Sequence, residues 1–187
     1  MRMFVAVTPP PEVIEHLAEF LEPRQEVDSP LRWSLPEQWH VTLAFLPSVA
    51  DTDLDELGDE FTAAAAKRSS FALQLKGAGA FPNPAEAKAL WAGMAGDVEP
   101  LGRLATGTRS AVVRAGLEVD GGRFRPHLTL ARVGRAHDVT RWLRILDLYE
   151  GPSWQVKEFA LIQSYLGGGR KGRSRYEVRE LFPLRGK

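Results

Sequence analysis

Apolar and polar positions along the chain repeat with the periods of both strands and helices. The apolar run over residues 1–8 predicts a strand, and the apolar positions within 12–21 recur at the three- and four-residue spacing of a helix. Further strands are expected at 31–35, 40–46, 71–75, 88–94, 127–133, 154–165 and 174–181, and further helices at 51–66, 101–115 and 138–148. The last two strands flank a glycine-rich loop, so we expect them to form a hairpin.

The order of these elements favours an α+β fold. Strands come in pairs separated by single helices, with no strict alternation of strand and helix, which predicts mostly antiparallel sheet. Two halves of the chain can be overlaid, since each places a strand that begins with histidine after a turn. We therefore expect residues 1–187 to form a single domain made of two similar lobes.

The composition is that of an ordinary globular protein, with 187 residues, 44% apolar and 26% charged, and no cysteine. The lack of cysteine excludes a disulfide scaffold, a Cys-ligated metal site and a thiol nucleophile. The first apolar run is too short for a signal peptide, and no later run approaches the length of a membrane span. We expect a cytoplasmic protein that is a monomer and has no membrane partner.

Charge is distributed unevenly although the net charge is zero. Residues 12–60 hold 13 acidic and 2 basic side chains, whereas residues 61–187 hold 21 basic and 11 acidic ones. The densest basic run, over 170–179, follows and includes glycines of the predicted hairpin loop. Two interpretations remain open: the run attracts a polyanion, or it is a solvated loop and strand edge whose charges discourage edge pairing.

The strongest signal is a repeated tetrapeptide, H-V-T-L at 40–43 and H-L-T-L at 127–130. Side chains at i and i+2 of a strand share one face, so each motif presents an imidazole beside a hydroxyl while its apolar residues enter the core. If the two halves face each other, two rings and two hydroxyls surround a shared cleft. A pair of purely structural histidines is disfavoured by the repeated threonine, and zinc is disfavoured because two histidines leave its coordination incomplete.

Two imidazoles and two hydroxyls suit the cleavage of a phosphodiester. A water must lose a proton as it attacks phosphorus, and the leaving oxygen must gain one on the opposite side. Histidine can serve as either base or acid near neutrality because its ordinary pKa is about 6.5. The threonine hydroxyls can donate to the nonbridging phosphate oxygens, where negative charge grows. The residues alone supply both roles without saying which ring takes which.

The two motifs and their surroundings resemble a known family. With W-H-V-T-L-A-F-L (39–46), A-L-W-A-G (89–93) and R-P-H-L-T-L-A-R (125–132), the chain is similar over nearly its whole length to the two-histidine (2H) phosphoesterase superfamily. Within it, the chain most resembles the bacterial and archaeal RNA 2',3'-cyclic phosphodiesterases, once called 2'-5' RNA ligases. The resemblance implies a two-lobed α+β fold with pseudo-twofold symmetry, in which antiparallel sheets line a central cleft and helices lie outside.

The resemblance also implies an activity and roles for the motif residues. The expected reaction is hydrolysis, without metal or cofactor, of a 2',3'-cyclic phosphate at an RNA 3' end or on a nucleotide, giving the 2'-phosphate. His40 would be the general acid that protonates the 3' oxygen, and His127 the general base that activates water. Thr42 and Thr129 would hold the phosphate oxygens.

Arg132 is a further candidate for phosphate binding, because a guanidinium can grip two phosphate oxygens and the family motif often carries arginine there. It lies five residues after His127, so an unbroken strand would turn it to the opposite face, and only a bulge or strand end would bring it to the cleft. Four aromatic residues could stack a base or belong to the core; they are Trp33, Phe45, Phe124 and Tyr176.

Two alternative functions fit the same residues. A 2',5'-linkage RNA ligase or 2',5'-oligonucleotide phosphodiesterase would use the same acid and base, the ligase by running the chemistry in reverse. A noncatalytic module that binds nucleotide or RNA would use the same fold without turnover. Turnover of a cyclic nucleotide and the identity of its product separate the three.

Overall fold

The computed structural model describes residues 1–187 and contains four α-helices and nine strands. The helices are α1 (Pro11–Gln25), α2 (Leu54–Ala66), α3 (Val98–Arg114) and α4 (Thr140–Leu146). The strands are β1 (Arg2–Val7), β2 (Arg32–Trp33), β3 (Val41–Leu46), β4 (Phe71–Phe81), β5 (Ala87–Gly96), β6 (Leu128–His137), β7 (Glu150–Val156), β8 (Glu158–Tyr165) and β9 (Arg175–Pro183). None of the helices combines the length and the apolar character that crossing a membrane requires.

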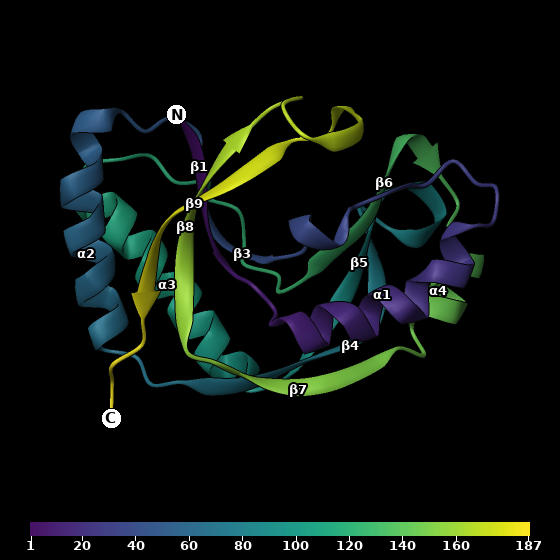
Figure 1. The fold of residues 1–187 in the computed structure, drawn as a ribbon, viewed down its shortest axis with the longest axis horizontal. Coiled ribbons are helices and arrows are strands. Elements are labelled where there is room, and N and C mark those ends of the chain that lie inside the picture. Colours follow the sequence, from purple (N-terminus) through teal and green to yellow (C-terminus); the bar gives the residue numbers. More distant parts are fainter.

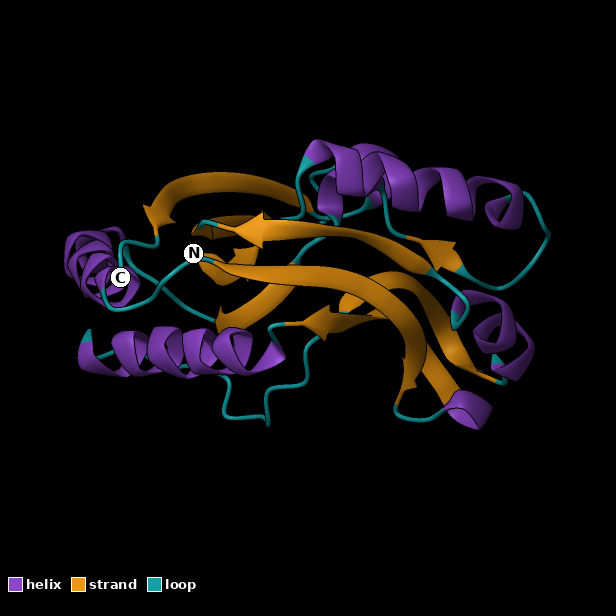
Figure 2. Ribbon diagram, turned by 90° about the horizontal axis from the view of Figure 1, so that it is seen from below, coloured by secondary structure: helices purple, strands orange, loops and turns teal.

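The strands form one antiparallel sheet in the order β7-β4-β5-β6-β3-β1-β8-β9, with β2 pairing to β6 (Figure 1). Helices α2 and α3 pack against the half that holds β3 and β9, whereas α1 and α4 pack against the half that holds β4 and β7. Figure 2 shows the sheet curled, with helices on its outside in both halves. The predicted α+β fold is confirmed, and its antiparallel sheet is continuous from one half to the other.

The two halves of the sheet meet at a single pair of residues, Val41 of β3 opposite Leu128 of β6. Both strands begin at this pair, and because they are antiparallel they run away from it in opposite directions. Both side chains are fully buried, as expected for the apolar position between each motif histidine and its threonine. The join between the halves therefore lies at the two motifs.

Strand β1 is apolar on both of its faces, which explains why the sequence shows an apolar run there. Met3, Val5 and Val7 belong to the main core beneath the helices, while Phe4 and Ala6 belong to a small second cluster on the opposite face. Phe45 and Tyr176 pack against that second cluster. This cluster supports the concave side of the sheet.

Several predicted boundaries were wrong for reasons of pairing. The expected strand at 154–165 divides at Lys157 into β7 and β8, because its two parts pair with β4 and β1 respectively. Strand β4 continues well past the expected 71–75, through Gly77, where a positive φ of 74° suits glycine. The expected strand at 31–35 is reduced to β2. The predicted hairpin around the glycine-rich loop is confirmed as β8 and β9.

Candidate active site

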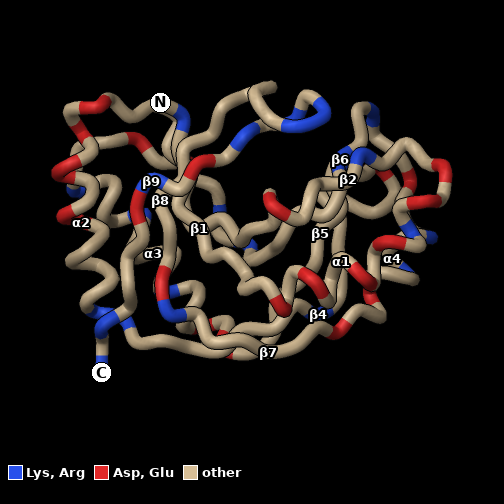
Figure 3. Tube along the Cα trace, viewed as in Figure 1, with Lys and Arg blue, Asp and Glu red and all other residues tan.

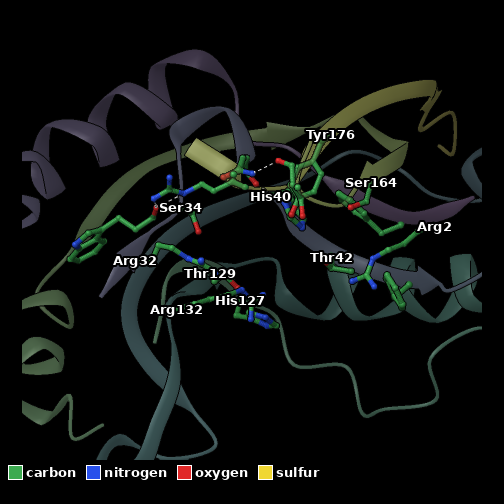
Figure 4. Close-up of a pocket in the computed structure, with 18 residues that line it drawn as sticks. Arg2, Arg32, Ser34, His40, Thr42, His127, Thr129, Arg132, Ser164 and Tyr176 are labelled. Atoms are coloured by element: carbon green, nitrogen blue, oxygen red, sulfur yellow. Dashed lines mark hydrogen bonds between the residues drawn. The ribbon is translucent and has the colours of Figure 1, made fainter. Parts of the chain in front are cut away.

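A cavity of about 470 Å³ lies at the join between β3 and β6, and 18 residues from both halves of the sheet line it (Figure 4). Its volume suits a ligand of nucleotide size. Five residues selected from the sequence are brought together on its walls, namely His40, Thr42, His127, Thr129 and Arg132. All but the exposed Arg132 are half-buried.

The register of the join explains why the four motif side chains meet. Val41 lies opposite Leu128, so one residue further in each direction His40 is set against Thr129 and Thr42 against His127. Neighbouring residues of a strand point to opposite faces, and these four side chains therefore share the face away from the buried pair. Each imidazole thus lies across from the hydroxyl of the other motif.

A bulge in β6 brings Arg132 to the cavity. Ala131 lies opposite Leu90 and Thr129 lies opposite Trp91, so a single step along β5 spans two along β6. The extra residue is Leu130, and both Leu130 and Ala131 are buried. The next residue, Arg132, consequently points to the same face as the histidine. An unbroken strand would have turned Arg132 to the opposite face, and the bulge is what prevents this.

Strand β3 carries the equivalent bulge. Ala44 lies opposite Val5 and Thr42 lies opposite Ala6, so β3 contains one extra residue, Leu43, relative to β1. Phe45, five residues after His40, is thereby turned into the cavity just as Arg132 is in the other half. Residues 40–45 and 127–132 therefore follow the same geometry. They differ at the sixth position, where Phe45 supplies an aromatic ring and Arg132 a guanidinium.

Both imidazoles are held by a backbone carbonyl two residues earlier in the chain. His40 Nδ1 lies 2.7 Å from the carbonyl oxygen of Gln38, and His127 Nδ1 lies 2.6 Å from that of Arg125. A carbonyl oxygen can only accept, so each Nδ1 carries a hydrogen and donates it. In the neutral ring Nε2 is then the free acceptor, and in the protonated ring Nε2 is a free donor.

Aromatic rings support each imidazole from behind. The ring of Phe4 lies 4.6 Å from His40, centre to centre, and Tyr176 meets the same imidazole edge-on at 5.5 Å. In the other half Phe81 meets His127 edge-on at 4.9 Å, with Trp91 at 6.1 Å. These contacts restrict how far each ring can tilt, so the direction of Nε2 is fixed by both packing and hydrogen bonding.

The surroundings of both histidines favour the neutral ring. The pKa of His40 is lowered to about 4, mainly by burial and to a smaller extent by repulsion from His127 and Arg132, against the opposing effect of the Gln38 carbonyl. Burial also lowers the pKa of His127, assisted by Arg132 and opposed by the Arg125 carbonyl. The neutral ring is therefore the favoured form of both imidazoles at neutral pH.

The walls of the cavity are strongly basic. Four arginines line it and no aspartate or glutamate does. Arg2 and Arg32 were not selected from the sequence, nor were Ser34 and Ser164, whereas Arg173 was noted only as part of the basic run. Arg32 and Ser34 are two residues apart beside a short strand, as Arg2 and Phe4 are in β1, and that spacing was the available signal.

Arg173 belongs to the basic run over 170–179, whose role the sequence left open, because the β8–β9 loop reaches the cavity by a contact across the molecule. Its Nε and Nη2 donate to the Trp33 carbonyl at 3.1 and 2.8 Å. Gln38 Nε2 donates to the Ser174 carbonyl at 2.7 Å, and Arg170 pairs with Glu37 at 3.2 Å. Figure 3 shows the basic positions of this loop in blue along the chain trace. The basic run is thus partly a wall of the cavity rather than only a solvated strand edge.

Three of the four candidate aromatic residues line the cavity, namely Trp33, Phe45 and Tyr176. Phe45 lies under the guanidinium of Arg2, whose Cζ is 4.6 Å from the ring centre. Phe124 does not line the cavity and instead lies near Arg109.

Comparison with known proteins agrees with this geometry. Residues 9–168 match the family model described as the 2'-5' RNA ligase superfamily. The chain is 34% identical to an RNA 2',3'-cyclic phosphodiesterase of Thermus thermophilus, over 100% of this chain and 91% of the relative. It is 30% identical to one of Archaeoglobus fulgidus, over 89% and 92% of the two chains. Among solved structures, Escherichia coli LigT in complex with 3'-AMP is similar, with a TM-score of 0.77, 26% identity, and coverage of 98% and 97%.

Proposed function

Because this chain belongs to the 2'-5' RNA ligase superfamily, we propose that it hydrolyses a 2',3'-cyclic phosphate, at an RNA 3' end or on a nucleotide, to the 2'-phosphate. Relatives with up to 34% identity are RNA 2',3'-cyclic phosphodiesterases. The observation that carries the proposal is the pair of imidazoles from two separate motifs, each with Nδ1 occupied by a carbonyl, which share one basic cavity.

The proposed reaction needs one proton removed and one supplied. His127 Nε2 accepts a proton from a water molecule as the water oxygen forms its bond to phosphorus. The bond from phosphorus to the 3' oxygen breaks, and His40 Nε2 donates its proton to that oxygen. The products are a 2'-phosphate and a free 3' hydroxyl, and the two histidines end with the proton exchanged between them.

Three side chains would bind the phosphate: the neutral hydroxyls of Thr42 and Thr129 and the charged guanidinium of Arg132. Thr42 and Thr129 can donate to the nonbridging oxygens, where charge increases toward the transition state. Arg132 on the same face can donate two hydrogen bonds to those oxygens. These donors are part of the folded sheet, so little reorganisation is needed when the phosphate binds.

The protonation of His40 is coupled to the arrival of substrate. A ring with a pKa of about 4 is neutral at pH 7, whereas an acid must carry a proton. The negative charge of the phosphate, placed beside the ring, raises its pKa and favours uptake of that proton. His127 is neutral from the start, as a base requires.

We also propose that residues 1–187 act as one domain of two similar lobes, with the motif at 40–43 in one and that at 127–130 in the other. One chain supplies both imidazoles and every residue that lines the cavity, so a monomer suffices for the reaction. The cytoplasm, where RNA ends are available, is the proposed compartment.

The test is incubation with adenosine 2',3'-cyclic phosphate in the presence of EDTA, resolving the 2' from the 3' monophosphate. We expect turnover to the 2' product, with a bell-shaped dependence on pH. Replacing His40 or His127 by alanine should lower kcat by about 10²- to 10⁴-fold, as expected for loss of a general acid or base. His16→Ala is the matched control, because His16 is exposed on α1 outside the cavity, and it should retain full activity.

Three outcomes contradict the proposal in different ways. Full activity in either motif-histidine variant would remove that histidine from the mechanism. Faster cleavage of a 2',5'-linked dinucleotide than of the cyclic nucleotide would favour the 2',5'-linkage activity. Nucleotide binding without turnover at every pH would favour a noncatalytic binding module.

A further inference from the structure

The cavity carries more positive charge than one cyclic phosphate can balance. Its four arginines face no carboxylate, and none of them forms an ion pair elsewhere in the molecule. A 2',3'-cyclic phosphate carries a single negative charge. An excess of this size favours a ligand with additional anionic groups over an isolated cyclic nucleotide.

Two of the arginines are placed directly opposite each other. Arg32 of β2 is the register partner of Arg132 of β6. Like charges directly opposite in an antiparallel pair are destabilising, so this arrangement costs folding free energy unless an anion lies between or above the two guanidiniums. An anion bound beside these two guanidiniums would therefore stabilise the folded sheet.

A third arginine reaches the same end of the cavity from the β8–β9 loop. Arg173 is bonded through Nε and Nη2 to the carbonyl of Trp33, the residue that follows Arg32. Its Nη1 is not used by these bonds. Arg32, Arg132 and Arg173 together are called the arginine cluster below.

The cluster extends away from the two histidines rather than surrounding them. Arg132 is the member whose charge lowers the pKa of both His40 and His127, so it lies on the histidine side. Ser34 follows Arg32 by two residues, and its amide bonds to the Leu130 carbonyl at 2.8 Å. Along β2 the register therefore carries the chain from Arg32, opposite Arg132, to Ser34, bonded to Leu130, and both Arg32 and Ser34 line the cavity.

We propose that Arg32, with Ser34 and the free edge of Arg173, binds a second phosphate, the one attached to the 5' oxygen of the nucleoside that carries the cyclic phosphate. In RNA this group is the last internucleotide linkage. Arg132 then lies between the two phosphates and serves the scissile one. The inference rests on the proposed function and deepens it: a substrate with a phosphate on its 5' oxygen is preferred to a bare cyclic nucleoside phosphate.

The test compares adenosine 2',3'-cyclic phosphate with its 5'-phosphorylated form, at fixed ionic strength, on the full chain. We expect the unaltered protein to show a kcat/KM at least tenfold higher on the 5'-phosphorylated substrate. Arg32→Gln should remove this preference by raising KM about ten- to a hundredfold on the 5'-phosphorylated substrate, the value of a charge-assisted hydrogen bond, and should raise KM on the other substrate much less.

Arg135→Gln is the matched control. Arg135 is an exposed arginine of β6 outside the cavity, so the variant loses the same charge from the same lobe and should leave both substrates unchanged. An equal loss on both substrates in Arg32→Gln would place Arg32 on the scissile phosphate and overturn the inference. Unchanged kinetics on both would overturn it as well.

Failure of the proposed function gives a different result. The unaltered protein would then turn over neither substrate, and binding would be measured instead by titration with adenosine 2',5'-bisphosphate and adenosine 2'-monophosphate. A tighter affinity for the bisphosphate that Arg32→Gln abolishes would support the second phosphate site without the activity. Equal affinities in the unaltered protein would overturn the site itself.

Discussion

The two imidazoles of the cavity are held in the same manner but are not surrounded equally. Each donates Nδ1–H to a carbonyl two residues earlier and rests on an aromatic ring. His40 is enclosed by Phe4 and Tyr176 and has a pKa of about 4, well below the ordinary value for histidine. Because burial keeps this ring neutral in the folded protein, the free energy of unfolding depends on pH.

The sign of that dependence follows from which state binds the proton. Between about pH 6.5 and 4 the unfolded chain protonates this histidine and the folded chain does not. The stability linked to His40 is therefore fully present above pH 6.5 and is lost as the pH falls through this window. At pH 5 the loss from a single group of this kind is about 2 kcal/mol.

We accordingly predict that His40→Asn makes the protein less sensitive to acid. The asparagine amide can occupy the place of Nδ1 and donate to the Gln38 carbonyl, while the titrating ring is gone. Urea unfolding at pH 7.5 and pH 5 should show the free energy of unfolding falling by about 2 kcal/mol less in the variant than in the unaltered protein.

The control for this measurement is His16→Asn. His16 is exposed, and its ring forms one hydrogen bond, in which Nδ1 lies 2.9 Å from the Tyr149 hydroxyl oxygen. Its replacement should leave the difference between the two pH values unchanged. The interpretation would be wrong if His40→Asn lost stability between pH 7.5 and 5 as steeply as the unaltered protein.

At the scale of strands, the position of the site depends on two bulges. Period-two alternation in the sequence correctly placed His40, Thr42, His127 and Thr129 on one face, because each pair is two residues apart within a regular segment. The same rule placed Arg132 on the wrong face. One extra residue in β6 corrects this, and no composition feature of the L-A pair within it distinguishes a bulge from a continuing strand.

Long-range pairing accounts for the other features that sequence reasoning did not supply. The split at Lys157 follows from β7 and β8 having different partners, and the short β2 follows from its pairing with β6 alone. Arg173 joins the cavity through a bond to a residue 140 positions away. Which strands pair depends on contacts between residues far apart in the chain, and these contacts produce no periodic pattern in the local sequence. Alternating burial and turns, in contrast, are encoded by neighbouring residues and can be predicted from them.

A glycine in β4 maintains the support behind His127. A Cβ added to Gly79 would come within 2.1 Å of Cζ2 of Trp91, whose ring packs 5.2 Å from Phe81 and 6.1 Å from His127. Gly79→Ala must therefore displace Trp91 and, through it, the imidazole. We expect the free energy of unfolding to fall by about 1–3 kcal/mol and kcat on the cyclic nucleotide to fall as well.

Gly102→Ala is the comparison for this effect. Gly102 lies within α3 with nothing within 4 Å of an added Cβ, so alanine should raise the free energy of unfolding by up to about 1 kcal/mol and leave kcat unchanged. Thermal or urea unfolding with steady-state kinetics on both variants provides the measurement. Unaltered kcat in Gly79→Ala would show that Trp91 does not position His127.

Across the whole molecule, the β8–β9 loop adds a second contact between the two halves on the cavity side, beside the strand pairing at the join. Their sheets meet at the single pair of Val41 and Leu128, and the β8–β9 loop crosses the cavity to the segment at 33–38. The loop comes from the half that carries His40, while the residues it reaches include β2, which pairs with the half that carries His127. The loop contacts therefore close one side of the cavity and constrain how far the halves can separate there.

The last prediction concerns the hydrogen bond from Gln38 Nε2 to the Ser174 carbonyl. Gln38→Met keeps the shape of the side chain and the main-chain carbonyl that holds His40, but it removes this bond and the weaker one that Gln38 Oε1 accepts from the Leu35 N–H at 3.3 Å within the same turn. Amide exchange in residues 167–174 should become faster, KM should rise several-fold, and kcat should change little, because the loop forms a wall and not the reacting groups. Glu177→Gln breaks an exposed ion pair in β9 outside the cavity and should alter none of these quantities. If exchange in the loop stays as slow in Gln38→Met as in the unaltered protein, the contacts with Trp33 and Glu37 suffice to hold it, and the Gln38 bond has no part in closing the cavity.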